Sequence, residues 1–125
     1  MMSCVFCDYP KEDYIIENEL AFVIYDKFPV NEGHMLVIPK RHFASYFKAT
    51  QAEIIAIFEL TKECKKILEA EYNPDGYNIG FNVNYSGGQT VMHLHQHLIP
   101  RYEGDVDNPR GGIRRLKKQL VYYDG

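Results

Sequence analysis

Short apolar runs separated by turn-forming residues occupy the first third of the chain, a pattern typical of β-strands. Residues 20–25 (LAFVIY) form one run, and residues 34–38 (HMLVI) form a second that Pro39 closes. The segment between them, residues 26–33, contains proline, asparagine and glycine, which are turn signals. We therefore expect two buried strands in this part of the chain.

The next segment has the period of an amphipathic helix. Thr50 and Glu53 match a capping box, and residues 73–76 (NPDG) contain helix-stop signals. We expect one long helix between these signals, because apolar residues recur there at spacings of three and four. Its expected apolar face consists of Ile54, Ile57, Phe58, Thr61, Cys64 and Leu68.

Two further strands are expected after the helix. Residues 77–83 alternate between apolar and polar side chains, and residues 93–99 form another run that Pro100 closes. Strands, one long helix and further strands, in that order, predict an α+β domain with a mostly antiparallel sheet. In the polar segment 104–125, only residues 116–123 are expected to hold secondary structure.

Composition and charge indicate a single domain and bear on where the protein is expected to be located. Of the 125 residues, 46% are hydrophobic, which is enough for a single core without disulfides. The formal net charge of −3 argues against a nucleic-acid binder, because such proteins usually carry a basic excess. We find neither a secretory leader nor an apolar run of the ~20 residues that cross a membrane, so we expect a cytoplasmic protein.

Three of the five histidines alternate in sequence, at His93, His95 and His97. On a strand they would share one face at a spacing of about 6.6 Å, and a solvated strand face is the simplest explanation. The preceding loop favours a phosphate site instead, where a neutral imidazole can act as nucleophile. The hydrogen-bond donors expected from that loop are the backbone of Gly87 and Gly88 and the side chains of Gln89 and Thr90.

The three cysteines do not match a disulfide framework, because their number is odd. Cys4 and Cys7 have a spacing that can bind tetrahedral zinc together with two histidines. A redox motif or two unrelated thiols are alternatives, although the βαβ context of a thioredoxin-like motif is missing. Cys64 lies on the apolar face of the expected helix and is interpreted as a core residue.

Four segments in the same order resemble the histidine triad (HIT) superfamily. Residues 93–101 (HLHQHLIPR) are similar to its signature, in which histidines alternate with apolar residues, and residues 33–42 (GHMLVIPKRH) resemble its second block. Residues 4–7 (CVFC) resemble the start of zinc-containing members, and residues 82–90 resemble the loop that holds phosphate.

This resemblance implies a HIT-like fold for residues 1–125, with its core at 4–101 and a polar tail at 102–125. In that fold an antiparallel sheet carries one long helix and a short helix, and two copies commonly pair as a homodimer. Gln96 stands where the family usually has an apolar residue. Because it points away from the histidine face, we expect it to affect packing and not chemistry.

By position, the resemblance makes His95 the nucleophile, which attacks the α-phosphate and forms a nucleotidyl-histidine that water or another acceptor resolves. His97 matches the histidine that contacts the phosphate and assists the leaving group, and His34 matches the one that supports the triad. The other implied substrate contacts are Gly88, Gln89 and Thr90 to phosphate, Asn82 nearby, Asp26 to the ribose, and Val5 and Phe6 to the base.

For zinc, the resemblance implies the ligands Cys4, Cys7, His42 and His93. In zinc-free relatives the residue matching His93 belongs to the hydrogen-bonded triad, so the presence of both cysteines and His42 favours zinc here. Four protein ligands leave no open position for water, and a structural metal is therefore expected.

The implied activity is that of a nucleotide hydrolase or nucleotidyl transferase, with a purine nucleotide, a dinucleoside polyphosphate or a nucleoside phosphoramidate as substrate. Residues 107–114 resemble the tail of relatives that act on dinucleoside polyphosphates, where Arg110 and Arg114 would bind the extra phosphates. An exposed basic tail explains these arginines equally well. Two other functions stay open: a slow nucleotide-binding regulatory module, and a metalloenzyme whose triad histidines hold one catalytic metal.

Overall fold

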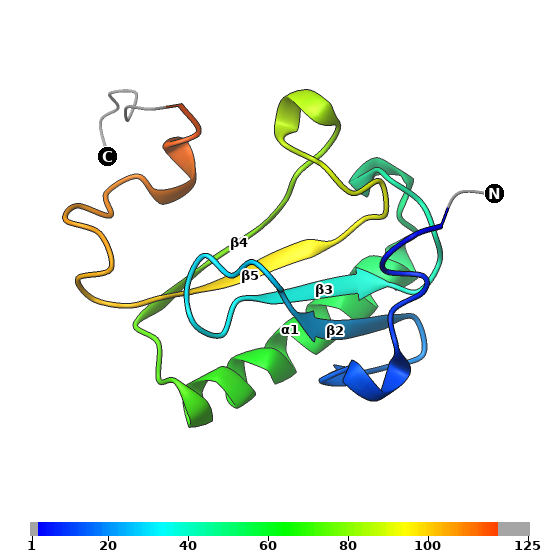
Figure 1. The fold of residues 1–125 in the computed structure, drawn as a ribbon, viewed down its shortest axis with the longest axis horizontal. Helices are drawn as coiled ribbons and strands as arrows, with labels where there is room; N and C mark the ends of the chain where they lie inside the picture. The colour runs from blue at the N-terminus through cyan, green and yellow to red at the C-terminus, as the bar shows by residue number, and fades with distance from the viewer. Residues whose placement is uncertain (1–2, 118–125) are drawn as a thin grey trace.

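The computed structural model describes residues 3–117, and its strands form one antiparallel sheet with a long helix across one face (Figure 1). The strands are β1 (Ile16–Glu17), β2 (Ala21–Tyr25), β3 (Met35–Pro39), β4 (Gly76–Phe81) and β5 (Gln96–Arg101), and the helix is α1 (Gln51–Glu71). Their order across the sheet is β1-β2-β3-β5-β4, with every neighbouring pair antiparallel. The expected α+β fold is confirmed.

Helix α1 begins at the predicted capping box. The Thr50 hydroxyl accepts from the backbone N–H of Glu53, and the Glu53 carboxylate accepts from the backbone N–H of Thr50. The same buried carboxylate accepts two hydrogen bonds from Arg41, at 2.9 and 3.0 Å, and this pair lowers the pKa of Glu53 to about 2. Because Arg41 follows β3, the ion pair ties the start of α1 to the sheet.

The buried face of α1 is rotated slightly from the expected one. Ile57, Cys64 and Leu68 are buried as predicted, and burial raises the pKa of the Cys64 thiol to about 12, which suits a core residue. Phe58, in contrast, is 60% exposed. Successive helix residues are about 100° apart, and Ala56 and Leu60 complete the stripe that faces the sheet, so Phe58 points to solvent.

The two faces of the sheet contact different partners. Val23, Val37 and Leu98 pack against α1 in the main core. Gln96 lies on this side too, and its Nε2 donates to the Thr61 hydroxyl of α1 at 2.8 Å. As expected, its side chain therefore points away from the histidine face and contributes to helix packing. The other face carries a second apolar cluster that includes Phe6, Phe22, Ile24, Leu36 and Ile38.

Strand β5 begins later than predicted, at Gln96, so His93 and His95 precede it. The backbone N–H of Leu94 donates to the carbonyl of Phe43 at 2.7 Å, which holds this segment against the loop after β3. Other strand boundaries differ by one or two residues, and β1 was not predicted. Strands β2 and β3 begin at Ala21 and Met35, β4 runs from Gly76 to Phe81, β3 includes Pro39, and β5 extends past Pro100 to Arg101.

The remaining elements are short. A 3-10 turn at Tyr46–Lys48 follows β3, and such turns take the place of the expected short helix in the described chain. The tail holds another 3-10 turn, Gly112–Arg114, which the sequence did not predict. The structure expected in residues 116–123 lies, from residue 118 onward, outside the described residues. Within residues 3–117, no helix combines the length and apolar character needed to span a membrane.

Candidate active site

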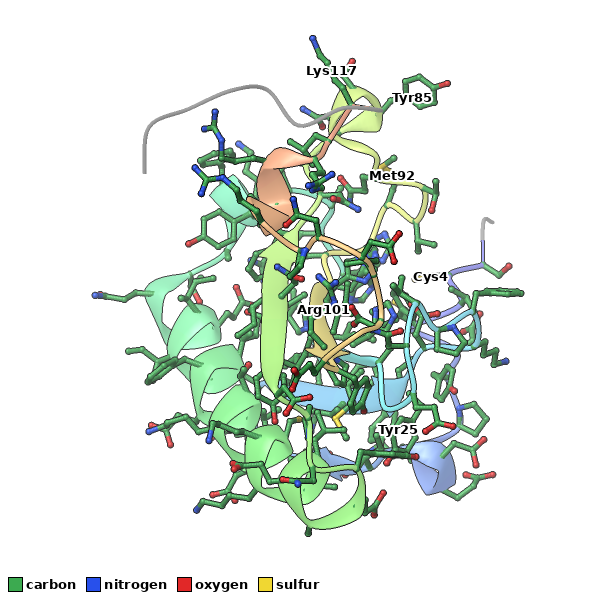
Figure 2. The ribbon with its side chains drawn as sticks, turned by 90° about the vertical axis from the view of Figure 1, so that its left-hand side faces the viewer. Cys4, Tyr25, Tyr85, Met92, Arg101 and Lys117 are labelled. Atoms are coloured by element: carbon green, nitrogen blue, oxygen red, sulfur yellow. The ribbon has the colours of Figure 1, made fainter. Side chains whose placement is uncertain are left out.

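The predicted functional residues gather on the face of the sheet opposite α1. In Figure 2, α1 lies to one side of the sheet and Cys4 lies to the other. The loop after β2 contributes Asp26 and His34, the loop after β4 contributes Asn82, and the segment before β5 contributes His95. The site is thus assembled from loops that the antiparallel sheet brings to one face.

Hydrogen bonding fixes the tautomer of His95. This side chain is buried, and its Nδ1 lies 2.9 Å from the backbone carbonyl oxygen of His93. Because a carbonyl can only accept, Nδ1 carries the hydrogen and donates it. The lone pair of His95 is therefore on Nε2, as a nucleophilic imidazole requires.

A second hydrogen-bond chain orients His97. The backbone N–H of Val30 donates to His34 Nδ1 at 3.0 Å, so the hydrogen of a neutral His34 is on Nε2. That Nε2 lies 3.0 Å from His97 Nδ1, which accepts, and His97 consequently presents an N–H at its own Nε2. The rings of His95 and His97 are adjacent, with centroids 5.1 Å apart. The unshared lone pair of His95 Nε2 and the N–H of His97 thus stand side by side.

Burial keeps this pair of supporting histidines neutral. It lowers the pKa of His97 to about 4, and the neighbouring imidazoles of His95 and His34 act in the same direction. The pKa of His34 is also lowered by burial, against the attraction of Asp26. Both rings therefore act as hydrogen-bonding groups and not as fixed cations at neutral pH.

A cavity of about 430 Å³ opens beside His95 and His97. Asp26, which is expected to bind ribose hydroxyls, lies on the wall of this cavity. One of its carboxylate oxygens accepts from the backbone N–H of Phe28 at 2.9 Å, and the other lies 3.4 Å from His34 Nε2. Of the expected substrate contacts, those lining this cavity are Val5, Phe6, Asp26, Asn82, Gly88 and Thr90.

Phe6 links the N-terminal segment to His95. Its buried ring meets the rings of His95 and His93 edge-on, with centroids 5.1 and 5.8 Å away. Val5, beside it, is half exposed at the cavity wall. The segment that carries the two cysteines therefore also buttresses the side chain expected to react.

Gln89 has a different place from the expected one. Its side chain is 2% exposed, and its Nε2 donates to the carbonyls of Ala44 at 2.9 Å and Val91 at 3.1 Å. Its Oε1 accepts from the backbone N–H of Asn84 at 2.9 Å. These bonds use the donors of the amide to brace the loop, so the side chain does not face the cavity.

The glycine turn also differs from the expected cradle. The N–H groups of Gly87 and Gly88 donate to the carbonyls of Asn84 and Tyr85, at 3.1 and 2.9 Å, within a 3-10 turn. They are consequently not free for a phosphate. Thr90, which is exposed and lines the cavity, is left as the loop residue best placed to donate.

Cys4, Cys7, His42 and His93 form a candidate metal centre, with ligand atoms all within 4.8 Å of one another. The Nδ1 atom of His93 is 3.4 Å from Cys4 Sγ and 3.5 Å from Cys7 Sγ, and Cys7 Sγ is 3.4 Å from His42 Nδ1. Tetrahedral zinc, with bonds of about 2.3 Å to sulfur and 2.0–2.1 Å to nitrogen, places its ligand atoms about 3.3–3.8 Å apart. The four residues fit zinc, although the Nδ1 atoms of His42 and His93, 3.0 Å apart, are slightly closer than this range.

The orientation of His93 supports the same conclusion. Its Nε2 lies 2.7 Å from the carbonyl oxygen of Pro39 and must donate to it. The lone pair on Nδ1 is then directed at the cysteines, and such a carbonyl partner is typical behind a metal-bound histidine. His93 thus faces the cysteines while its own carbonyl holds His95.

A catalytic metal held by the three triad histidines does not fit this geometry. His93 faces the cysteines, and His95 turns its Nδ1 to a carbonyl. Asp26, His34 and His97 also lie close enough to bind a cation, but the Val30 N–H keeps a hydrogen on the His34 nitrogen that would have to bind it. We interpret that trio as a hydrogen-bond relay.

Arg110 and Arg114 lie on the tail, outside the lining of the cavity at His95. Arg114 ends the 3-10 turn Gly112–Arg114, and neither arginine is among the described residues that line the cavity at His95. The relation of these two residues to extra phosphates therefore stays a prediction.

Comparison with known proteins agrees with the geometry. Residues 10–104 match the HIT domain. An uncharacterized HIT-like protein of Mycoplasma genitalium is 39% identical over 105 residues, 81% of this chain and 74% of that protein. Adenosine 5'-monophosphoramidase hnt1 of Schizosaccharomyces pombe is 34% identical over 104 residues, 80% and 75% of the two chains. The crystal structure of a zinc-bound histidine triad family protein from Mycobacterium smegmatis has a TM-score of 0.74 at 34% identity, covering 83% of this chain and 78% of that one. The chain described here belongs to the HIT family.

Proposed function

We propose that the protein is a nucleotide hydrolase or nucleotidyl transferase that acts at the α-phosphate through a covalent bond to His95. The observation that carries this proposal is the lone pair of His95 Nε2, set by the bond from Nδ1 to the His93 carbonyl. It stands beside a cavity of nucleoside size that Asp26 and Asn82 line. The phosphoramidase relative from Schizosaccharomyces pombe supports a phosphorus-centred reaction.

The reaction would proceed in two displacements. First, His95 Nε2 bonds to the α-phosphorus while the bond to the leaving group breaks in line with it. The Nε2–H of His97 donates a hydrogen bond to the departing atom, which takes its proton from solvent. Water or another acceptor then attacks phosphorus and loses its proton to solvent, which releases His95 and the nucleoside monophosphate.

We also propose that Cys4, Cys7, His42 and His93 hold a zinc ion. Zinc there would supply a structural crosslink with no open position for water. The zinc-bound relative from Mycobacterium smegmatis supports the metal, and the donor spacing in this chain fits it. The chain's own contribution is to fix the N-terminal segment, because Phe6 lies between the two cysteines and packs on His95.

The assembly and the location of the protein are further proposals. Strand β4 is one of the two edge strands of the sheet in the described chain, and Ile79 on it is 47% exposed, which supports pairing with a second copy as a homodimer. A reduced, cytoplasmic environment would keep Cys4 and Cys7 available as metal ligands.

The test incubates the protein separately with a dinucleoside tetraphosphate and a nucleoside phosphoramidate. Release of nucleoside monophosphate by the wild type, its loss in His95→Ala and its retention in Phe58→Ala, which is exposed on α1, are expected. Mass spectrometry of the quenched wild type should detect a nucleotidyl adduct on His95. Nucleotide binding without turnover would contradict the enzymatic proposal and favour a regulatory nucleotide-binding module.

A further inference from the structure

The residues of the proposed metal centre differ in their access to solvent. Cys7 and His42 are exposed and Cys4 is half-buried, whereas His93 behind them is buried. Cys64, the third cysteine, is buried in the core beneath α1. An oxidant dissolved in water therefore meets the thiol of Cys7 first and does not reach that of Cys64.

The thiols of Cys4 and Cys7 are close enough to react with each other. Their Sγ atoms lie within 4.8 Å, and the backbone N–H of Cys7 donates to Cys4 Sγ at 3.4 Å. The N–H of Asp8 donates to the Cys4 carbonyl at 2.9 Å and closes the turn that joins them. A disulfide needs sulfur atoms about 2.05 Å apart, whereas two sulfurs on one tetrahedral zinc are about 3.8 Å apart. The pair can therefore bind zinc or form a disulfide, but not both.

Phe6 connects this pair of thiols to the candidate active site. It lies between the two cysteines in sequence, and its buried ring meets the ring of His95 at 5.1 Å between centroids. Val5, from the same turn, lines the cavity beside His95. A change in the turn that carries Cys4 and Cys7 therefore moves part of the wall of the site.

His93 provides a second connection. Its Nδ1 lies 3.4 Å from Cys4 Sγ and 3.5 Å from Cys7 Sγ, and its carbonyl accepts from His95 Nδ1 at 2.9 Å. A disulfide has no hydrogen to donate, so the buried Nδ1 would keep only the exposed His42, 3.0 Å away, as a partner. Disulfide formation thus changes the surroundings of the residue whose carbonyl sets the tautomer of His95.

We propose that Cys4 and Cys7 form a redox modification site, in which oxidation by a peroxide to a disulfide displaces the zinc ion and slows the reaction at His95. Two of the four ligands are then lost, and His42 and His93 alone do not retain the metal. The inference rests on the proposed metal centre and, for its effect on turnover, on the proposed function.

The oxidation takes place in two steps. The Cys7 thiolate attacks one oxygen of hydrogen peroxide, the oxygen–oxygen bond breaks, and Cys7 becomes a sulfenic acid while hydroxide leaves. The Cys4 thiolate then attacks the Cys7 sulfur, the sulfur–sulfur bond forms, and a second hydroxide leaves. The two sulfurs supply the two electrons that reduce the peroxide, and two protons from solvent convert both hydroxides into water.

The experiment uses the zinc-loaded full chain, whose metal content is measured first, and adds hydrogen peroxide in modest excess. A colorimetric indicator follows zinc release, and mass spectrometry determines whether the peptide with residues 4–7 resists alkylation until it is reduced. We expect the disulfide and zinc release together, with faster amide hydrogen exchange in residues 3–9. We also expect kcat/KM for a nucleoside phosphoramidate to fall about tenfold or more, and dithiothreitol with zinc to restore it.

Two variants serve as controls. Cys64→Ala removes the buried thiol and leaves the turn intact, so it should respond to peroxide as the wild type does. Cys7→Asp replaces one thiolate by a carboxylate, which can bind zinc but cannot form a disulfide. In Cys7→Asp we expect the zinc content and the turnover to be the same before and after peroxide.

Zinc that stays bound while the thiols remain reduced would overturn the inference. So would a disulfide that leaves both hydrogen exchange and kcat/KM unchanged, or a loss of turnover in peroxide-treated Cys7→Asp that equals the loss in the wild type. A wild type without zinc before oxidation would remove the metal proposal and this inference with it. A zinc-loaded wild type without turnover would instead remove the proposed function, and zinc release and hydrogen exchange would still decide whether the disulfide controls the site.

Discussion

Replacement of Glu53 by glutamine removes one charge and keeps the shape of the side chain. The carboxylate accepts from Arg41 and from the first turn of α1, and its pKa falls from 4.5 to about 2. At 1.36 kcal/mol per pKa unit this is about 3.4 kcal/mol. The Arg41 side chain is 51% exposed, so water screens the pair, and we expect a loss of about 1–2 kcal/mol at pH 7.

The effect should depend on pH in a defined direction. A carboxylate whose pKa is lowered by folding stabilises the native state above its unfolded pKa, and this contribution is lost as the pH falls toward the folded value. The difference between the wild type and Glu53→Gln should therefore be full at pH 7 and shrink between about pH 4.5 and pH 2.

Urea unfolding at pH 7, 4 and 3 measures this difference. Glu63→Gln is the control, because Glu63 lies on the same helix with an exposed partner, Lys66, at 3.5 Å, and should cost less than about 0.5 kcal/mol. Equal losses in the two variants, or a Glu53 effect that does not change with pH, would refute the role of the buried ion pair.

Two other outcomes can be measured on the same protein. Metal analysis should find about one zinc per chain, lost in Cys7→Ser and retained in Cys64→Ala; a zinc-free wild type prepared without chelator would contradict the metal proposal. Gly33→Ala should destabilise by about 2–4 kcal/mol in urea unfolding, because Gly33 has φ +87° and a Cβ there would lie 2.7 Å from a Leu68 methyl. Gly104→Ala is the control for backbone strain alone, because φ is +84° there and no atom lies within 4 Å of the added Cβ. If both variants lose the same free energy of unfolding, crowding at Gly33 contributes nothing.

The elements that sequence predicted well are those set by neighbouring residues. The capping box at Thr50 and the apolar runs of β2 and β3 are local patterns, and the structure has them. The start of β5 was predicted too early, because the bond from Leu94 to Phe43 joins segments that no local pattern connects. Phe58 was misplaced because α1 has more apolar positions than its buried stripe can take.

In the candidate site, too, some features were predicted from the sequence and others were not. The resemblance indicated which residues meet, and the quartet of Cys4, Cys7, His42 and His93 does meet. It could not indicate that Gln89 turns inward, because its partners are backbone groups of residues that could have any side chain. The Val30 N–H that sets the tautomer of His34 is equally invisible in sequence.

The contact between Cys4 and His93 spans 89 residues of sequence and joins atoms 3.4 Å apart, and this affects how the protein is made. Ribosomes add about 5–20 residues per second, so the first cysteine waits about 4–18 seconds before its partner has been synthesised. During that interval the quartet of Cys4, Cys7, His42 and His93 lacks its last member. The surroundings of His95 are therefore completed late in biosynthesis, when the part of the chain that was made first docks Phe6 against it.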